Sequence, residues 1–372
     1  MLFGLKRQLV RFPIVLYMLF QTGLFMRFQN SCCLPAGKGR QLFLATSLVC
    51  TLLAIQVSVS SAAPALPHTP SSVKNQEKDR RPKAIEIEAG YGYRRDSLDW
   101  NIAGDIQGNN PDVLSELKWK DLLIHEFHLD TRVNLNKSII LKGSINYGVI
   151  VDGDNRDSDY AADNREEEFS RSINDADQGH TLDTLLGVGY RFRLISESCS
   201  VIPLVGYSYH RQYLTMRDGY QARTWAGGPP LGSFGGLDST YDANWQGPWI
   251  GLEMILETEK FAKTLPPISF YATWEYHWAD YSAEADWNLR DDFKHPNSFE
   301  HEADGTGMVA SLGVCLRLSD RWSVMLGYET EEWSTEEGVD KLFLSNDTVV
   351  KTRLNEVNWH SDVIKIGCSV RF

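Results

Sequence analysis

Apolar and polar residues alternate with a period of two along most of the chain after residue 83. In segment 307–318, for example, Met308 and Leu312 share one face, whereas Gly313 and Arg317 lie on the other. Successive side chains of a β-strand point to opposite faces, so this alternation predicts strands with one apolar and one polar face. No stretch after residue 63 approaches 18 consecutive apolar residues, so the pattern gives no indication of a spanning helix.

Strands with two such faces occur in soluble β-sandwiches and in membrane β-barrels that are apolar outside and polar inside. The ends of the apolar faces favour the barrel, because they carry the aromatic residues that a membrane interface requires. These aromatic residues are Tyr91, Tyr93, Tyr147, Trp274, Trp278, Trp322 and Tyr328. The opposite faces carry glycine and the charged residues Glu86, Glu88, Arg191, Arg193, Glu253, Glu257 and Lys365. The chain also ends on Phe372 within an alternating segment, which is typical of outer-membrane barrels.

The alternation predicts ten strands, over residues 83–95, 112–135, 138–151, 180–195, 199–217, 244–259, 267–286, 307–318, 321–337 and 354–372. Links after even-numbered strands are short and links after odd-numbered strands are long, as in barrels with short periplasmic turns and long extracellular loops. The sequence therefore predicts an all-β fold: a ten-stranded antiparallel transmembrane β-barrel with five long extracellular loops and both termini periplasmic. A barrel this narrow is expected to be filled by oppositely charged inward side chains rather than to form an open pore.

Residues 1–62 have the organisation of a leader with a secretory signal peptide. Lys38 and Arg40 precede an apolar run at 42–55, and small residues follow, with cleavage expected after Ala62. A start at Met26 is an alternative to the first residue. Residues 63–82 are predicted to be a periplasmic linker and residues 83–372 the barrel, which places the protein in the cell outer membrane.

Charge is unevenly distributed along the chain. Residues 1–63 carry six basic residues and no acidic one, so the rest of the chain holds 31 basic and 49 acidic residues and has a net charge of −18. Such a body repels phosphate backbones, which argues against nucleic acid as a partner. It favours basic peptides or basic host surface proteins as partners, beside the outer-membrane lipid itself.

Four local motifs resemble the omptin family of outer-membrane aspartic-type proteases and adhesins. The runs at 115–120 and 151–154, Gly206-Tyr207 with Arg211, and the run at 248–252 match that family's second, third, fifth and sixth strands in order. The resemblance covers residues 83–372 and implies an omptin-like barrel.

The same resemblance implies a proteolytic site at the outer rim, where an Asp pair and an Asp-x-His pair activate a water molecule between them. Neutral His can take a proton from water near pH 7, and a carboxylate can stabilise the resulting imidazolium. The first pair corresponds to Asp152 and Asp154. In the seventh strand, Ala285 and Trp287 occupy the positions of the second pair, and a shift of one residue gives Asp286 without a matching His.

Three other histidines are candidates for the missing base. His277 lies too far down its strand, on the face that points into the lumen. His295 and His301 follow the seventh strand and could act only if that loop folds back. The sequence therefore favours a degenerate protease site.

Tyr207 and Arg211 match positions that contact lipopolysaccharide in the omptin family, and Arg is well suited to bind a phosphate group. The family's Glu and second Arg correspond here to Tyr209 and Asn244. The resemblance thus implies lipopolysaccharide as a possible activating lipid, and no other cofactor is expected. The acidic run that begins at Asp152 lacks EF-hand spacing, so no metal site is predicted.

The resulting prediction is a surface-exposed barrel with a binding, adhesin or structural role and a degenerate protease site. An aspartic-type endopeptidase of omptin type that cleaves basic peptides is the alternative. A small-solute pore is the third possibility.

Overall fold

The computed structural model describes residues 84–194 and 198–372, within a unit that spans Glu77–Phe372. The predicted leader at 1–62 and linker at 63–82 lie outside the described residues. No helix in the described part of the chain has the length and apolarity that crossing a bilayer requires.

The described residues form one sheet of 14 strands and two short helices. The strands are β1 (Ala84–Ile102), β2 (Ser115–Asn134), β3 (Ile139–Ala162), β4 (Glu166–Asp175), β5 (Gly179–Tyr190), β6 (Phe192–Leu194), β7 (Cys199–Arg223), β8 (Gly232–Ser233), β9 (Asp238–Glu257), β10 (Ile268–Asp286), β11 (Phe299–Arg317), β12 (Trp322–Thr335), β13 (Gly338–Phe343) and β14 (Val349–Arg371). The helices are η1 (Asp163–Arg165) and α3 (Thr258–Phe261).

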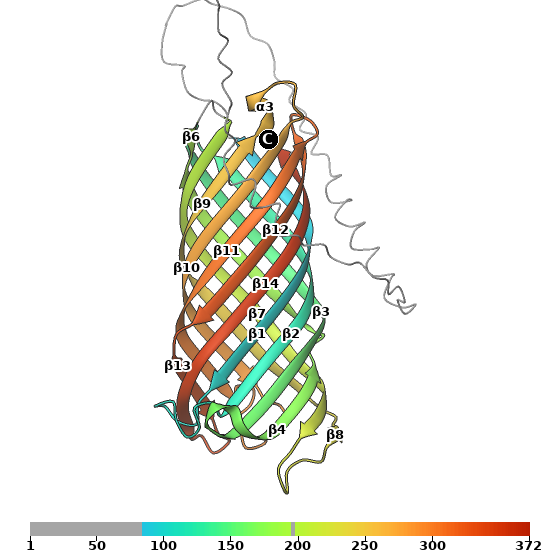
Figure 1. Cartoon of the computed structure of the whole chain (residues 1–372), viewed down its shortest axis with the longest axis vertical. Coiled ribbons are helices and arrows are strands. Elements are labelled where there is room, and N and C mark those ends of the chain that lie inside the picture. Colours follow the sequence, from blue (N-terminus) through green and yellow to red (C-terminus); the bar gives the residue numbers. More distant parts are fainter. Residues whose placement is uncertain (1–83, 195–197) are drawn as a thin grey trace, which may run out of the picture. The chain divides into compact units, whose positions relative to one another are not determined.

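The sheet closes on itself because β1 pairs antiparallel with β14, from Glu86 opposite Arg371 to Ile102 opposite Leu354. The order around the ring is β1-β2-β3-β4-β7-β9-β10-β11-β12-β14. β5 lies between β3 and β7 and so continues the wall position of β4, and β13 lies between β11 and β14 and continues that of β12. The ring therefore has ten wall positions, which confirms the predicted ten-stranded antiparallel barrel (Figure 1).

The two ends of the barrel differ. One end, called the base, carries Phe372, the start of β1, α3 and the connections at 135–138 and 318–321 (Figure 1). The other end, called the rim, carries η1, β4, β8 and β13 together with the connections at 103–114 and 224–237.

The strands extend farther toward the rim than the sequence predicted. β3 continues to Ala162 and β14 begins at Val349, so several stretches predicted as loops are strands. The reason is physical. Beyond the bilayer neither face of a strand has to be apolar, and residues such as Asp154 and Asp157 do not produce the alternation that marked the membrane-embedded parts.

The outward face carries the predicted apolar and aromatic belt. Val188, Trp274, Trp278 and Tyr328 are each 42–48% exposed on the outer wall. Apolar side chains that face hydrocarbon are stabilised there, so this belt marks the part of the barrel that the bilayer surrounds.

The lumen is filled from its middle to the rim. An apolar cluster that includes Trp100, Trp119, Tyr241 and Trp359 packs inside the strands. Toward the base, a cavity of about 520 Å³ is instead lined largely by charged side chains. The predicted charged lumen is thus present in the base half.

A single cation sits among three carboxylates at the boundary between these two regions. Arg94 bonds to Asp96 through two nitrogens at 2.8 Å each and to Glu126 and Asp183 at 3.0 and 2.5 Å. All four side chains are at most 6% exposed. Because buried carboxylates need a partner, Arg94 holds strands β1, β2 and β5 to one another through the lumen.

Replacement of Arg94 by Met should therefore destabilise the barrel by about 3–5 kcal/mol, because three buried carboxylates lose their shared cation. The measurement is the urea midpoint of the refolded protein in micelles, followed by tryptophan fluorescence. Arg95→Met is the matched control. Arg95 has a 63% exposed side chain and a single pair with Asp121 at 3.6 Å, so its loss should cost about 0–1 kcal/mol. Equal midpoints for the two variants would contradict the role of Arg94.

Candidate functional site

The connection between β10 and β11, residues 287–298, is tied to other parts of the rim and is called here the rim strap. Its Asn288 accepts a hydrogen bond from the backbone N–H of Asp238 at 2.9 Å and donates one to the carbonyl of Gly236 at 2.7 Å. Farther along, the Lys294 ammonium pairs with Asp347 at 3.0 Å. The rim strap thus joins the connection before β9 to the connection between β13 and β14.

An acidic pair faces the interior of the rim on the opposite side of the ring. Asp157 of β3 lies opposite Leu117 in the register with β2, and Leu117 belongs to the apolar cluster of the lumen. Asp159 occupies the same face two residues later. The Oδ1 atom of Asp157 is buried and has no hydrogen-bond partner among the described residues.

Burial raises the pKa of both carboxyls, that of Asp157 well above its usual range, and the neighbouring Asp159 raises the pKa of Asp157 further. Ser115 and Ser170 bond to Asp159 and oppose its shift. Arg290 of the rim strap lies close enough to lower the pKa of both carboxyls. Two carboxylates in this arrangement can share a proton or bind a cation between them. Arg290 acts on them through its charge only, because its guanidinium makes a bidentate ion pair with Asp292 at 2.9 Å.

A histidine and a carboxylate form a pair at the two ends of the same connection. His295 Nδ1 lies 2.6 Å from Asp286 Oδ1, with the side chains 38% and 28% exposed. The hydrogen bond to Asp286 raises the pKa of His295. The rim strap folds back, which is the condition under which the sequence analysis allows His295 to act as the base. Asp286 thereby gains a His partner that the sequence of its own strand does not provide.

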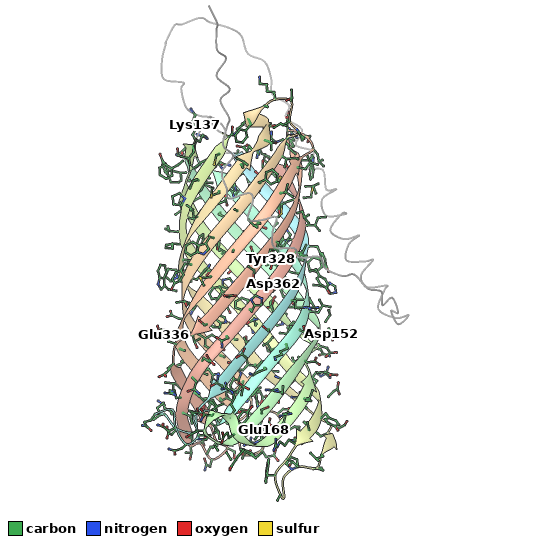
Figure 2. All side chains as sticks on the ribbon, viewed as in Figure 1. Lys137, Asp152, Glu168, Tyr328, Glu336 and Asp362 are labelled. Carbon is green, nitrogen blue, oxygen red and sulfur yellow. The ribbon has the colours of Figure 1, made fainter. Side chains whose placement is uncertain are left out.

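The structure places the predicted pair Asp152 and Asp154 on the outer wall, where both side chains are exposed (Figure 2). Asp154 lies opposite Lys120 of β2. The left-handed backbone of Gly153, with φ of +152°, accompanies a register shift that turns the two carboxylates outward. Asp152 and Asp154 therefore face away from the interior of the rim, and the structure does not bring them together with Asp286. Their catalytic role remains a prediction.

The two other candidate histidines are sealed inside the barrel. His277 is 1% exposed, with Nδ1 3.0 Å from Ser208 Oγ and Nε2 3.4 Å from Glu275, which confirms that it faces the lumen. His301 is fully buried and contacts the Tyr241 hydroxyl at 2.9 Å and Asp340 at 3.3 Å. Neither is open to a substrate in this structure.

The predicted lipid-binding residues lie on the outer wall. Tyr207 is 51% exposed. Arg211 makes a bidentate ion pair with Asp242 at 2.8 and 2.6 Å, so a phosphate group would compete with a carboxylate for it. Tyr209 donates to Asn244 at 2.6 Å, and these are the two positions at which the sequence departs from the omptin pattern.

Negative charge is concentrated toward the rim. Five rim-side stretches together hold 31 acidic and 12 basic residues. They are residues 99–121, 152–178, 214–243, 284–304 and 332–356. This difference of −19 accounts for the whole net charge of the chain after residue 63, so the remainder of the barrel is nearly neutral.

Sequence reasoning missed Asp157, Asp159 and Arg290 as members of one site. The acidic run lies between the strands predicted at 138–151 and 180–195, in a stretch that is predicted to be a loop. The available signal was the Asp157-Ser158-Asp159 spacing itself, because a period of two puts both carboxylates on one face once the segment is a strand.

The family model described as Protochlamydia outer membrane protein matches residues 88–372. No curated protein sequence matches the chain. Among solved structures, the chain is similar to the outer membrane protease OmpT from Escherichia coli, with a TM-score of 0.63 and 14% identity over 78% of this chain and 97% of that one. It is more distantly similar to the translocator domain of the autotransporter NalP from Neisseria meningitidis, with a TM-score of 0.34 and 9% identity over 79% and 90% of the two chains. These identities show the fold alone.

The replacement Asp286→Asn should lower the pKa of His295 toward its ordinary value of about 6.5, because it removes the negative charge that stabilises the imidazolium. In the wild type the raised pKa means that the pair contributes stability below about pH 6.5, which is lost as the pH rises through the folded value. The measurement is an NMR titration of histidine-labelled protein, with the His295 signal assigned from its loss in His295→Gln. An unchanged midpoint in Asp286→Asn would contradict the pairing.

Proposed function

The chain belongs to the Protochlamydia outer membrane protein family, and from this premise we propose that it is an outer-membrane β-barrel that binds cationic partners at its rim. The observation that carries the proposal is the inward-facing pair Asp157 and Asp159, in which Asp157 Oδ1 is buried without a hydrogen-bond partner among the described residues. Two inward carboxylates of which one oxygen has no partner suit an Arg or Lys side chain of a basic peptide or basic host surface protein.

The rim faces the cell exterior in this proposal. The base has both described chain ends nearby and the shorter links, such as 135–138, and barrels of this class keep their short turns periplasmic. The acidic stretches would then project from the bacterial surface. Their summed field would raise the rate at which cationic partners reach the rim, which is a property expected of an adhesin.

An endopeptidase of omptin type is the second candidate, and the His295–Asp286 pair favours it. A His held by a carboxylate can act as a general base, and an acidic pair beside the substrate can position water. The acidic pair would be Asp157 and Asp159 in place of the predicted Asp152 and Asp154. Lipopolysaccharide at Tyr207 and Arg211 would be the activating lipid, as the omptin resemblance implies.

The third candidate, a small-solute pore, has less support. The apolar cluster around Trp119 and Trp245 fills the lumen between its middle and the rim. Planar-bilayer recordings with discrete conductance steps would favour the pore over the binding proposal.

The binding proposal predicts that a fluorescent oligo-arginine peptide binds the refolded barrel and that the double variant Asp157→Asn/Asp159→Asn binds it at least about tenfold more weakly, which is about 1.4 kcal/mol. Asp152→Asn/Asp154→Asn removes the same charge from the outer wall and is the matched control. Anisotropy titrations should show a much smaller loss for the control. Equal losses would mean that diffuse rim charge, and not the acidic pair, binds the peptide.

Binding should also depend on pH and on Arg290. The pKa values of Asp157 and Asp159 are raised, so both carboxyls become protonated at a pH above the ordinary Asp pKa of about 3.9. Because a protonated carboxyl no longer attracts a cation, the affinity for the peptide should already fall in that pH range. Arg290→Ala removes a positive charge that acts on both carboxyls and should strengthen binding of a cationic peptide at neutral pH. Weaker binding by Arg290→Ala would contradict the view that the charge of Arg290 competes with the partner.

The endopeptidase is tested separately with a quenched dibasic peptide, with and without lipopolysaccharide. Wild-type protein that binds oligo-arginine but leaves the peptide intact supports the binding role. Cleavage that is lost in both His295→Gln and Asp157→Asn would identify the protein as the endopeptidase, and loss in Asp154→Asn alone would return the site to the outer wall.

A further inference from the structure

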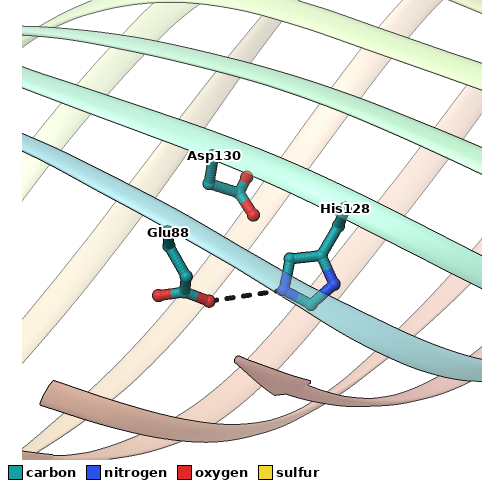
Figure 3. Close-up of side chains that lie close together, drawn as sticks. All are labelled: Glu88, His128 and Asp130. Carbon is teal, nitrogen blue, oxygen red and sulfur yellow. Dashed lines mark ion pairs between the residues drawn. The ribbon is translucent and has the colours of Figure 1, made fainter. Parts of the chain in front are cut away.

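Three potential metal ligands converge in the base half of the lumen, far from the rim. Glu88 of β1 lies directly opposite Asp130 of β2, and His128 lies two residues earlier on the same inward face of β2. One ligand atom from each side chain lies within 4.8 Å of the other two, and His128 Nε2 is 3.5 Å from Glu88 Oε1. Figure 3 shows the three side chains pointing toward one another.

The imidazole is buried without the partners that buried polar groups require. The side chain of His128 has no exposed surface, and neither ring nitrogen has a hydrogen-bond partner among the described residues. Glu88 Oε1 is likewise buried and without a hydrogen bond. Buried polar atoms are nearly always satisfied in native proteins, so two unsatisfied ring nitrogens beside two carboxylates indicate a missing ligand.

Two glycines make room for this cluster. Gly90 lies opposite both His128 and Gly367 in the paired strands. A Cβ atom at Gly90 would lie 2.4 Å from His128 Cε1, and one at Gly367 would lie 2.8 Å from Glu88 Oε1. The ring therefore lies against a wall that only glycine leaves open, which is the geometry of a built site.

Two lysines lie near enough to attract Asp130 electrostatically, but both form their ion pairs with other carboxylates. Lys365 is held by Glu329 at 2.6 Å and Glu126 at 3.6 Å, and Lys142 by Glu275 at 3.5 Å. Within the described residues, no arginine or lysine forms an ion pair with Glu88 or Asp130. Both carboxylates also line the cavity toward the base, which gives an ion a path from that end.

We propose that Glu88, His128 and Asp130 bind a divalent first-row transition metal ion, with Zn²⁺ as the best fit. One imidazole and two carboxylates suit Zn²⁺, and a tetrahedral site with bonds of about 2.0–2.2 Å needs ligand atoms about 3.3–3.6 Å apart. The His128–Glu88 distance already meets that spacing, and a small rotation of Asp130 completes it. The fourth position faces the cavity and is left for water.

The test uses the full-length protein, purified in detergent, stripped with a chelator and titrated with Co²⁺ as a spectroscopic probe for Zn²⁺. Wild-type protein should bind one Co²⁺ per chain with the visible absorption of a four-coordinate site, and Zn²⁺ should displace it. X-ray absorption of the zinc-loaded protein should show one nitrogen and otherwise oxygen ligands. Absence of stoichiometric binding to the wild type would overturn the proposal without any variant.

His128→Gln and Asp130→Asn should each weaken Co²⁺ binding at least tenfold. Two variants are matched controls: His125→Gln changes a histidine of the same strand that bonds to Tyr91, and Glu86→Gln changes a carboxylate of the same cavity that pairs with Arg371. Both should bind as the wild type does. Equal binding by all four variants would mean diffuse attraction to the acidic rim. Heat-modifiable gel migration checks that each variant is folded.

Discussion

The barrel depends on one constraint, which is that no backbone polar group can be left unpaired inside a bilayer. The pairing of β1 with β14 meets that constraint by removing the two edges that an open sheet would expose. Once the ring is closed with ten wall positions, its lumen is too narrow to hold bulk water along its length. Side chains must fill it, and the way in which they do so divides the molecule into its parts.

The filling differs along the axis. Toward the rim, tryptophan and tyrosine side chains pack against one another, and Trp333 stacks on Trp359 with ring centroids 5.4 Å apart. Toward the base, charged groups of both signs surround a cavity, and most of them are paired. Arg94 lies between these regions. The separation leaves the acidic pair at the rim and the Glu88 cluster at the base as independent sites in different dielectric surroundings.

The sequence could predict the barrel because the bilayer imposes a period of two on every membrane-embedded strand. It predicted the outward aromatic residues, such as Trp274, and the lumenal position of His277, because both follow from the face on which a residue lies. It could not predict the rim in the same way. There the phase of the alternation changes at Gly153, so Asp157 and not Asp152 faces inward, and only a three-dimensional register reveals that change.

The contacts of the rim strap have a consequence for the order of assembly. Asn288 is held by Gly236 and by Asp238 at the start of β9, whereas Lys294 is held by Asp347, which is made after nearly all of the barrel has been synthesised. The strap can therefore reach its final position only when the last hairpin is in place. A barrel stalled before closure would have most of its wall but would lack the contacts that hold the rim strap in place, so the rim would take its final form last.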